Sequence, residues 1–369
     1  MDAPDFREDY MSQLLDWSSR NAIATALGSQ VYVISMITSK TVMICDTAAS
    51  ASATAANAED PNPILPSPPN VSAISWTPSG THLAVGDTAG HLTVWDCERV
   101  RQIRSLEGHL KGKLVALDWN AHCLASGDRN GNVLLRDPRM IVSTTTTLSK
   151  QQVCGLKWAP DTPQLAIGDA FGHVRIYDAR RLSAPMQTLC PYSATPAGAR
   201  ALAWSPHRRG LLAVGGGTLD PTIRFWDTLG HHRHAGKDGM DIVPCSEILT
   251  TSQVCTLAWS TESNELVSTH GFCDQKYVTH YPERIFTASN SICIWRHKCD
   301  DGVVVNLPSQ LELRTQLRLH NARPIHMARS PDNEHIVTGA SDECIMCWSV
   351  FPTVAVSNTM ASRSRTLLK

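Results

Sequence analysis

The chain has 369 residues, and 42% of them are hydrophobic, which is enough for a large folded core and too many for a disordered chain. Its 33 Lys and Arg residues nearly balance 34 Asp and Glu residues, which argues against a nucleic-acid-binding protein built on a general basic surface. The N-terminus lacks a basic segment followed by an apolar one, and no apolar run approaches the roughly 18 residues of a membrane span. We therefore expect an intracellular chain whose cysteines stay reduced.

A repeated unit runs through the chain. Residues 86–96, 127–137 and 168–178 read GDTAGHLTVWD, GDRNGNVLLRD and GDAFGHVRIYD, and each segment begins 41 residues after the one before it. Residues 217–227 and 339–348 read GTLDPTIRFWD and GASDECIMCW. A period near 41 residues that closes on Trp-Asp is typical of a WD-repeat β-propeller, in which each repeat supplies four strands.

A second anchor lies upstream in each unit, at the end of its first predicted strand. In chain order the anchors are Trp17, Trp76, Trp119, Trp158, Trp204 and Trp259, with Arg329 in that place in the last unit. Runs such as VSAISW lead into them, as expected for strands buried on both faces between blades. The sequence therefore predicts an all-β, seven-bladed propeller over residues 1–355, followed by a C-terminal tail over 356–369.

Short turns connect the predicted strands. Pro, Ser, Asp and Gly after the anchors favour a hairpin, so the next strand should return antiparallel. The Gly-Asp pairs that begin at Gly86, Gly127 and Gly168 predict a tight turn, because glycine accepts a positive φ and Asp bonds to nearby backbone. The aromatic ring that ends the third strand should fill the wedge between neighbouring blades.

Longer connections interrupt the regular spacing. Residues 47–70 are rich in Ala, Ser and Pro and predict a flexible loop, and residues 228–249 form a second connector. Trp259 and Trp295 lie 36 residues apart, whereas the usual gap between the two aromatic anchors of a unit is 19. We expect the difference, roughly 17 residues, to be a surface insert within 274–288.

Two groups of side chains resemble metal ligands. Cys344 and Cys347 form a CxxC pair, but they fall on the third predicted strand of the last blade, where residues three apart face opposite sides. His231, His232 and His234 cluster in a connector, for which a solvated polar loop is the simpler interpretation. We predict no metal site at either position.

A glycine-rich segment resembles a phosphate-binding loop. GHLKGK at residues 108–113 lacks one spacer residue and is followed by Leu114 where Ser or Thr is required. Its Gly-His fits the Gly-His element of a WD repeat instead. The sequence carries none of the common hydrolase, metalloprotease or dinucleotide motifs, so we predict a binding protein without a catalytic site or cofactor.

The residues beyond the generic repeat resemble one family. Residues 2–33 are similar to the opening of the Fizzy and Fizzy-related propellers, the WD-repeat coactivators that recruit substrates to the anaphase-promoting complex, a multi-subunit ubiquitin ligase. Further matches in the same order include QVCGLKWAP, LLAVGGGTLDPTIRFW, SQVCTLAW, ELVSTHGF and ARPIHMARSPDNEHIVTGASDECIMCW. The resemblance spans nearly the whole chain and implies a receptor for short degradation signals (degrons) that activates the ligase during mitosis or meiosis.

The resemblance implies a groove for the destruction box, RxxL, between the first and last blades. Family members place acidic residues there against the degron Arg, and by resemblance these are Asp16 and Glu343. A closed ring brings those two units together, and two carboxylates can form charge-assisted bonds to one guanidinium. The alternative is that both acids are solvated or form turns.

The resemblance implies a second site, for the KEN box, on one face near the central channel. Thr218, Gln253 and Arg323 correspond to family residues there, and an Arg, an amide and a hydroxyl suit the Glu and Asn of such a peptide. The alternative is turn geometry for Thr218 and solvated loop contacts for the other two. The family's GGNDN turn reads GDAFG at 168–172, without the usual Asn.

Two ligase-docking elements of the family are not found in the printed sequence. One is the N-terminal C-box, and the other is a C-terminal Ile-Arg, where this sequence ends Leu-Leu-Lys. Two hypotheses stay open: a degron receptor that activates the ligase, or a diverged scaffold that binds partners without activating it. The expected partners are ligase subunits and substrates such as cyclins, with no nucleic acid or membrane, in the nucleus and cytoplasm.

Overall fold

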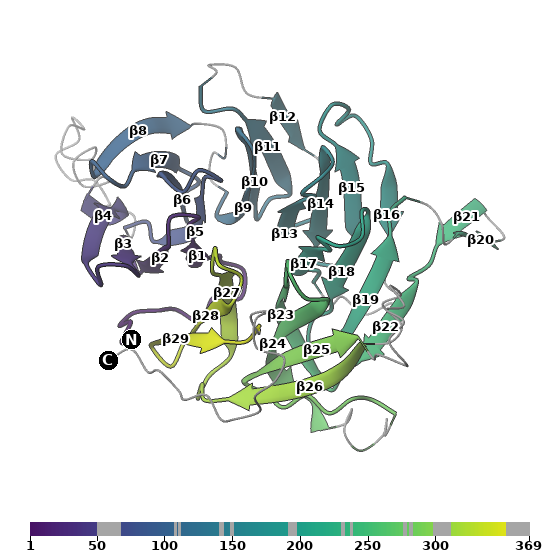
Figure 1. Ribbon diagram of the computed structural model, residues 1–369. Coiled ribbons are helices and arrows are strands. Elements are labelled where there is room, and N and C mark those ends of the chain that lie inside the picture. The colour runs from purple at the N-terminus through teal and green to yellow at the C-terminus, as the bar shows by residue number, and fades with distance from the viewer. Residues whose placement is uncertain are drawn as a thin grey trace.

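The computed structural model describes residues 1–49, 68–106, 109, 112–139, 144–147, 151–190, 198–229, 233–236, 239–275, 279, 283–297 and 311–351. Seven antiparallel sheets of three or four strands are arranged around a central axis (Figure 1). The prediction of an all-β, seven-bladed propeller is therefore confirmed. Within this described part of the chain, no helix reaches the length and hydrophobicity that a membrane span requires.

Each blade takes its strands consecutively from the chain. Blade one comprises β1 (Leu15–Trp17), β2 (Ala22–Leu27), β3 (Gln30–Ser35) and β4 (Thr41–Asp46). Blade two comprises β5 (Val71–Trp76), β6 (His82–Asp87), β7 (Leu92–Asp96) and β8 (Arg101–Leu106). Blade three comprises β9 (Leu114–Asn120), β10 (Cys123–Asp128), β11 (Asn132–Arg136) and β12 (Thr144–Thr147). Blade four comprises β13 (Val153–Trp158), β14 (Gln164–Asp169), β15 (Val174–Asp178) and β16 (Gln187–Leu189).

Of the last three blades, blade five takes β22 as its fourth strand and blade seven has three strands, whereas blade six follows the same scheme. Blade five comprises β17 (Ala201–Trp204), β18 (Leu211–Gly215), β19 (Thr222–Asp227) and β22 (Ser246–Leu249). Blade six comprises β23 (Ser252–Trp259), β24 (Glu265–Cys273), β25 (Ser291–His297) and β26 (Leu311–Arg318). Blade seven comprises β27 (Pro324–Arg329), β28 (His335–Ala340) and β29 (Cys344–Ser349).

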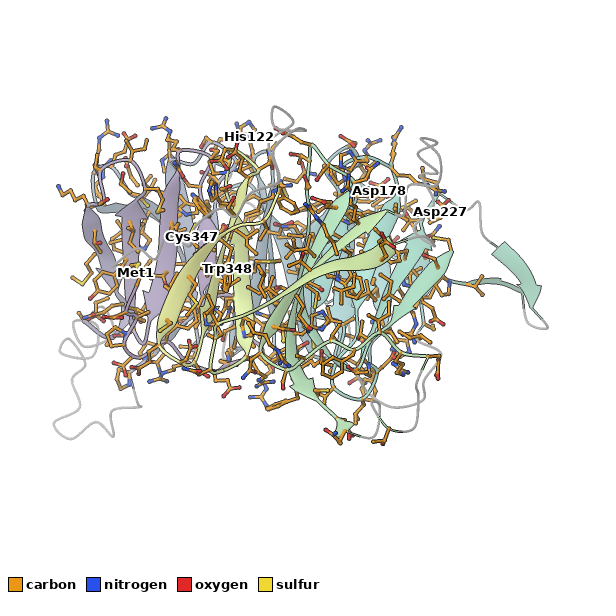
Figure 2. All side chains as sticks on the ribbon, turned by 60° about the horizontal axis from the view of Figure 1, so that its bottom comes forward. Met1, His122, Asp178, Asp227, Cys347 and Trp348 are labelled. Atoms are coloured by element: carbon orange, nitrogen blue, oxygen red, sulfur yellow. The ribbon has the colours of Figure 1, made fainter. Side chains whose placement is uncertain are left out.

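The long connections between strands contribute little to the blades. Between β19 and β22 a two-stranded hairpin, β20 (Arg233–Gly236) and β21 (Gly239–Ile242), projects away from the blades (Figure 2). Residues 274–290 connect β24 to β25. Most of the loop expected over 47–70, and the tail expected over 356–369, lie outside the described residues.

The ring is closed by the first residues of the chain. The backbone N–H of Ala3 donates to the Glu343 carbonyl at 2.7 Å, and the N–H of Ile345 donates to the Met1 carbonyl at 3.0 Å. Figure 2 shows Met1 beside β29, the strand of blade seven that carries Cys347 and Trp348. Residues 1–14, which we call the closing segment, thus pair with the edge of blade seven through an isolated β-bridge between Asp2 and Cys344 before the chain enters β1.

An aromatic side chain of the closing segment seals this junction. Phe6 is only 2% exposed, and its ring lies edge-on to the His326 ring with the centroids 5.2 Å apart. It also lies against Gly339 of β28, where an added Cβ would come within 2.6 Å of the Phe6 ring. A side chain larger than hydrogen at that position would displace Phe6 from the junction.

The Gly-Asp turns form, but the sequence assigned the positive φ to the wrong glycine. Asp87 accepts two backbone N–H bonds with one carboxylate oxygen, including that of His91 at 2.8 Å, and blades three and four repeat the pattern. The positive φ, +94°, belongs to Gly90, in the middle of the turn. Gly86 is small for another reason, because an added Cβ would lie 2.7 Å from the Leu114 side chain of the next blade.

The upstream anchors tie neighbouring blades together. In blades three, five and six the indole N–H of the anchor donates to a backbone carbonyl of the preceding blade, as in Trp119 to Ser75, Trp204 to Lys157 and Trp259 to Ala203. Arg329 takes the anchor position in blade seven and donates to the Trp259 carbonyl at 2.6 Å. The guanidinium thus also bonds to the preceding blade, but at the carbonyl of the anchor itself and not of the residue before it.

Substitution of Phe6 tests whether the closing segment stabilises the ring. Phe6→Ala should lower the free energy of unfolding by about 3–5 kcal/mol, because it leaves a cavity between blade seven and the closing segment. Denaturant unfolding would measure the change against Phe171→Ala, whose ring is 43% exposed and outside the core. Equal midpoints for the two variants would contradict this role of Phe6.

Candidate peptide-binding surfaces

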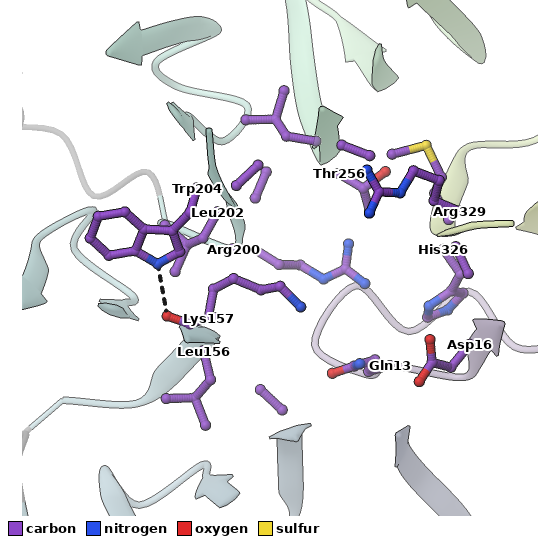
Figure 3. Close-up of a pocket in the computed structure, with 18 of the residues that line it drawn as sticks. Gln13, Asp16, Leu156, Lys157, Arg200, Leu202, Trp204, Thr256, His326 and Arg329 are labelled. Atoms are coloured by element: carbon purple, nitrogen blue, oxygen red, sulfur yellow. Dashed lines mark hydrogen bonds between the residues drawn. The ribbon is translucent and has the colours of Figure 1, made fainter. Parts of the chain in front are cut away.

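Asp16 lies on β1 with its carboxylate facing the central channel (Figure 3). One carboxylate oxygen accepts the N–H of Trp17 at 2.8 Å, and the other accepts the N–H of Trp76 at 2.7 Å. Burial raises the pKa of this carboxyl to about 6. Both oxygens are thus used by backbone donors, and one of those bonds joins blade one to blade two.

The same device recurs between blades three and four. Asp118 precedes its anchor as Asp16 does, and it accepts the N–H of Trp158 at 2.7 Å. Its second oxygen pairs with the Lys157 ammonium at 2.6 Å. An Asp directly before the anchor tryptophan was therefore a sequence signal for an inter-blade bond.

Glu343 lies in the exposed turn between β28 and β29, next to the closing segment. Its backbone has a φ of +56°, and its side chain accepts the N–H of Asp5 at 3.4 Å. Asp2 forms a β-bridge with Cys344, and the charges of Asp2 and Glu343 add to burial in raising the pKa of the Cys344 thiol. The exposed acids Asp2, Asp5 and Glu343 therefore lie together, and we call this group the seam.

The two acids predicted for the destruction box have different surroundings. The described bonds of the Asp16 carboxylate run to Trp17 and Trp76, whereas Glu343 contacts Ala3 and Asp5. No described contact joins Asp16 to Glu343. The acids that do lie beside Glu343 belong to the opening segment that carried the family resemblance, but spacing alone gave no means to pair them.

Two of the three residues predicted for the KEN box are in contact. The Arg323 guanidinium donates to the Gln253 amide oxygen at 3.0 Å, lies 4.0 Å from the centre of the Phe272 ring, and pairs with Glu8 of the closing segment at 2.5 Å. Gln253 is only 4% exposed, so its amide is held in place by burial. We call these four side chains the Arg323 cluster.

Thr218 lies in the turn between β18 and β19, half-buried. The N–H of Val254 on β23 donates to the Gly216 carbonyl at 3.1 Å, which places this turn beside the inner strand of blade six. No described contact joins Thr218 to Gln253 or Arg323. Its role as a ligand-binding residue stays a prediction.

Exposed apolar side chains surround the same face, and the sequence analysis missed them. Phe171 and Leu219 lie in the turns between second and third strands of blades four and five, and Phe272 lies at the corresponding end of β24. Because equivalent turns of successive blades lie on one face of the ring, these three side chains share the face of the Arg323 cluster. All three are more than two-fifths exposed.

Of the candidate metal ligands, the structure describes the side chains of Cys344 and Cys347. Among the described residues, no group of three or more His, Cys, Asp or Glu side chains is placed to hold a metal ion. Cys344 and Cys347 both lie on β29, paired with different residues of β28. His231 and His232 lie outside the described residues, and of His234 only the backbone, in β20, is described.

Comparison with known proteins gives a consistent result. The family model for the CDC20/Fizzy WD40 domain matches residues 1–348. Protein FIZZY-RELATED 2 of Arabidopsis thaliana is 36% identical over 97% of this chain, which spans 62% of that relative's length. The anaphase-promoting complex subunit cdc20 of Dictyostelium discoideum is 34% identical over 95% of this chain, which spans 60% of that protein.

A solved structure shares the architecture. A chain in the crystal structure of a mitotic checkpoint complex has a TM-score of 0.77 and 30% sequence identity to this chain. The match covers 95% of this chain and 94% of that one. The similarity therefore extends to the whole propeller.

Replacing Asp16 tests its role as an inter-blade tie. Asp16→Ala should lower the free energy of unfolding by about 1–3 kcal/mol for each backbone N–H left without an acceptor. Glu343→Ala, a carboxylate lost from an exposed turn, should change stability by no more than about 0.5 kcal/mol. Denaturant unfolding of both variants measures the difference, and a larger loss from Glu343→Ala would contradict the assignment.

The raised pKa of Asp16 predicts a pH dependence with a defined sign. An unfolded Asp titrates near 3.9, whereas Asp16 titrates at about 6 in the folded protein. The folded state therefore holds the proton more tightly, so the stability contributed by Asp16 is largest below about pH 4 and declines as the pH rises through 6. The stability difference between the wild type and Asp16→Ala should be larger at pH 4.5 than at pH 7.5. If the stability difference between the wild type and Asp16→Ala increased with pH instead, the result would contradict a raised pKa for Asp16.

Proposed function

The chain belongs to the CDC20/Fizzy WD40 family, and on that premise we propose that it is a receptor for destruction-box peptides that recruits their proteins to the anaphase-promoting complex and activates this ligase. Relatives over nearly the whole chain are named as subunits of that complex. A similar propeller is part of a mitotic checkpoint complex. Because the chain spans about three fifths of the first relatives, the activity of the whole assembly is part of the proposal.

The observation that carries the proposal is the seam. Asp2, Asp5 and Glu343 present carboxylates to solvent at one place on the surface. The bond from the Ala3 N–H to the Glu343 carbonyl holds the turn against the closing segment. An arginine side chain entering between them would meet carboxylates from two sides, which favours charge-assisted, bidentate bonds.

The pair of acids differs in one member from the sequence-based prediction. Glu343 is retained, since it is exposed and lies at the junction of the first and last blades. Asp2 replaces Asp16 in the proposal, because the Asp16 carboxylate already accepts two backbone N–H bonds inside the channel. A peptide Arg would have to enter the channel and share oxygens that already accept those two bonds in order to pair with Asp16.

The Arg323 cluster supports a second candidate function, the binding of KEN-box peptides. Arg323 offers a guanidinium to an acidic side chain, and Gln253 offers an amide to an Asn. Glu8 occupies the guanidinium in the free protein, so a peptide Glu would exchange with it. The neighbouring Thr218 turn would border such a peptide.

A charge reversal at the seam tests the main proposal. A fluorescent RxxL peptide should bind the protein more tightly than an AxxA peptide does, and Glu343→Arg should weaken RxxL binding by at least about tenfold, which is ~1.4 kcal/mol. Glu312→Arg is the matched control, since Glu312 is an exposed acid on the outer strand of blade six. The proposal fails if the two peptides bind equally or if both charge reversals have the same effect.

The alternative of a diverged scaffold makes a different prediction. A scaffold would bind the RxxL peptide and lose it with Glu343→Arg, yet it would not increase ubiquitination when added to the ligase. Ubiquitination of an RxxL substrate by the purified ligase, with and without this chain, separates the two. If the chain stimulates ubiquitination and Glu343→Arg abolishes that stimulation, the result supports a coactivator. If the chain binds the peptide but does not stimulate ubiquitination, the result supports a scaffold.

A further inference from the structure

A cavity of about 490 Å³ lies on the axis of the ring, outside both peptide surfaces (Figure 3). Side chains from six blades line it, all except blade two. Its volume falls within the range of pockets that hold small molecules, about 300–1,000 Å³. The question is whether the chemistry of its wall fits a ligand.

Arg200 extends from blade five across one end of this cavity. Its guanidinium donates to the carbonyls of Cys255 at 2.8 Å, Ile325 at 2.7 Å and Ser12 at 2.8 Å, on blades six and seven and the closing segment. All three acceptors are carbonyls, and no described carboxylate pairs with it. Burial lowers the pKa of this guanidinium. The end of the cavity thus carries a positive charge whose described hydrogen bonds all run to peptide carbonyls, and the charge of the Asp9 carboxylate also acts on it.

Two more cations point into the cavity from its wall. Figure 3 shows the ends of Lys157 and Arg329 directed toward its interior. The described bond of Arg329 runs to the Trp259 carbonyl, so this guanidinium also has no described carboxylate partner. Burial and the Arg329 charge lower the pKa of Lys157, but its charge interaction and hydrogen bond with Asp118 raise that pKa overall, so Lys157 lies near both Asp118 and Arg329.

Two carboxylates near these cations already accept hydrogen bonds. Asp118 accepts the N–H of Trp158 and pairs with Lys157, and Asp16 accepts two backbone N–H bonds. Lys157 therefore has a carboxylate partner in Asp118, whereas the described hydrogen bonds of Arg200 and Arg329 run to backbone carbonyls. No described hydrogen bond joins either acid to Arg200 or Arg329.

A buried donor without a partner also lines the cavity. The imidazole of His326 is 2% exposed, and its Nδ1 accepts the N–H of Leu14 at 3.3 Å. The neutral ring therefore carries its hydrogen on Nε2, which is buried and makes no hydrogen bond. Burying such a donor without an acceptor is costly, and native proteins rarely do so without a reason.

We propose that the central channel is a binding site for a small phosphate-bearing ligand, held by Arg329, Lys157 and the Nε2–H of His326 below Arg200. A phosphate group supplies several acceptor oxygens and one to two negative charges, which match donors that converge from different blades. Entry is from the face that carries the turns after the anchors, where Pro160 and Pro206 border the cavity, because Arg200 spans the other end. This site is independent of peptide binding at the seam.

Titration calorimetry on the full chain tests the proposal with inorganic phosphate, pyrophosphate and inositol hexakisphosphate as probes. At least one should bind with a stoichiometry near one, above the heat given by sodium chloride at equal ionic strength. Binding of inorganic phosphate alone identifies a free anion as the ligand, and binding of only the larger probes identifies a phosphate-bearing metabolite. If no probe binds beyond the salt control, the proposal is wrong.

Matched variants locate the binding site. Arg329→Gln keeps a donor for the Trp259 carbonyl but removes the charge, and it should weaken binding at least tenfold. Arg104→Gln, an exposed arginine on β8, should leave the affinity unchanged. If Arg329→Gln does not fold, Lys157→Gln serves the same purpose. If the cavity variant and Arg104→Gln bind the phosphate probe with equal affinity, the proposed site is wrong. Binding of the RxxL peptide to Arg329→Gln should stay at the wild-type level.

Discussion

Every blade of this propeller has two apolar faces, and only a closed ring can bury all of them, so closure is the constraint on which the rest of the structure depends. The closing segment closes the ring, because Met1–Ala3 pair with blade seven and Phe6 is buried against β28. The apolar cluster at this junction contains residues of blades one, two and seven together with Ala3 and Phe6. The first and last parts of the chain therefore form one core.

The closing segment also reaches each of the three surfaces described here. Near its start it supplies Asp2 and Asp5 to the seam, and farther along it supplies Glu8 to Arg323. At its end the Ser12 carbonyl accepts a bond from Arg200, and the Leu14 N–H donates to His326 in the channel wall. Loss of closure would thus disturb the two peptide surfaces and the channel at once, because one stretch of backbone positions residues in all of them.

The sequence predicted the ring, but it did not predict which groups the site residues contact. The repeat period and the anchors gave seven blades, and they placed Arg329 correctly as a substitute for a tryptophan, because spacing determines the order of strands. Spacing does not determine which neighbouring groups a side chain contacts. Asp16 was expected in a groove and instead faces the channel, since its position before the anchor directs it to the next blade's backbone. Contacts such as Ala3 with Glu343 join residues more than 300 positions apart, and no local pattern reports them.

The measurement that tests this account most directly is photo-crosslinking of an RxxL peptide that carries a diazirine beside its arginine, with the attachment sites read by mass spectrometry. The account predicts crosslinks to residues 1–5 and to the turn at Asp342 and Glu343, and their loss in Glu343→Arg. Crosslinks confined to the channel wall around Asp16, or to the face around Gln253 and Arg323, would contradict it, because they would show that the seam is not where the peptide arginine binds.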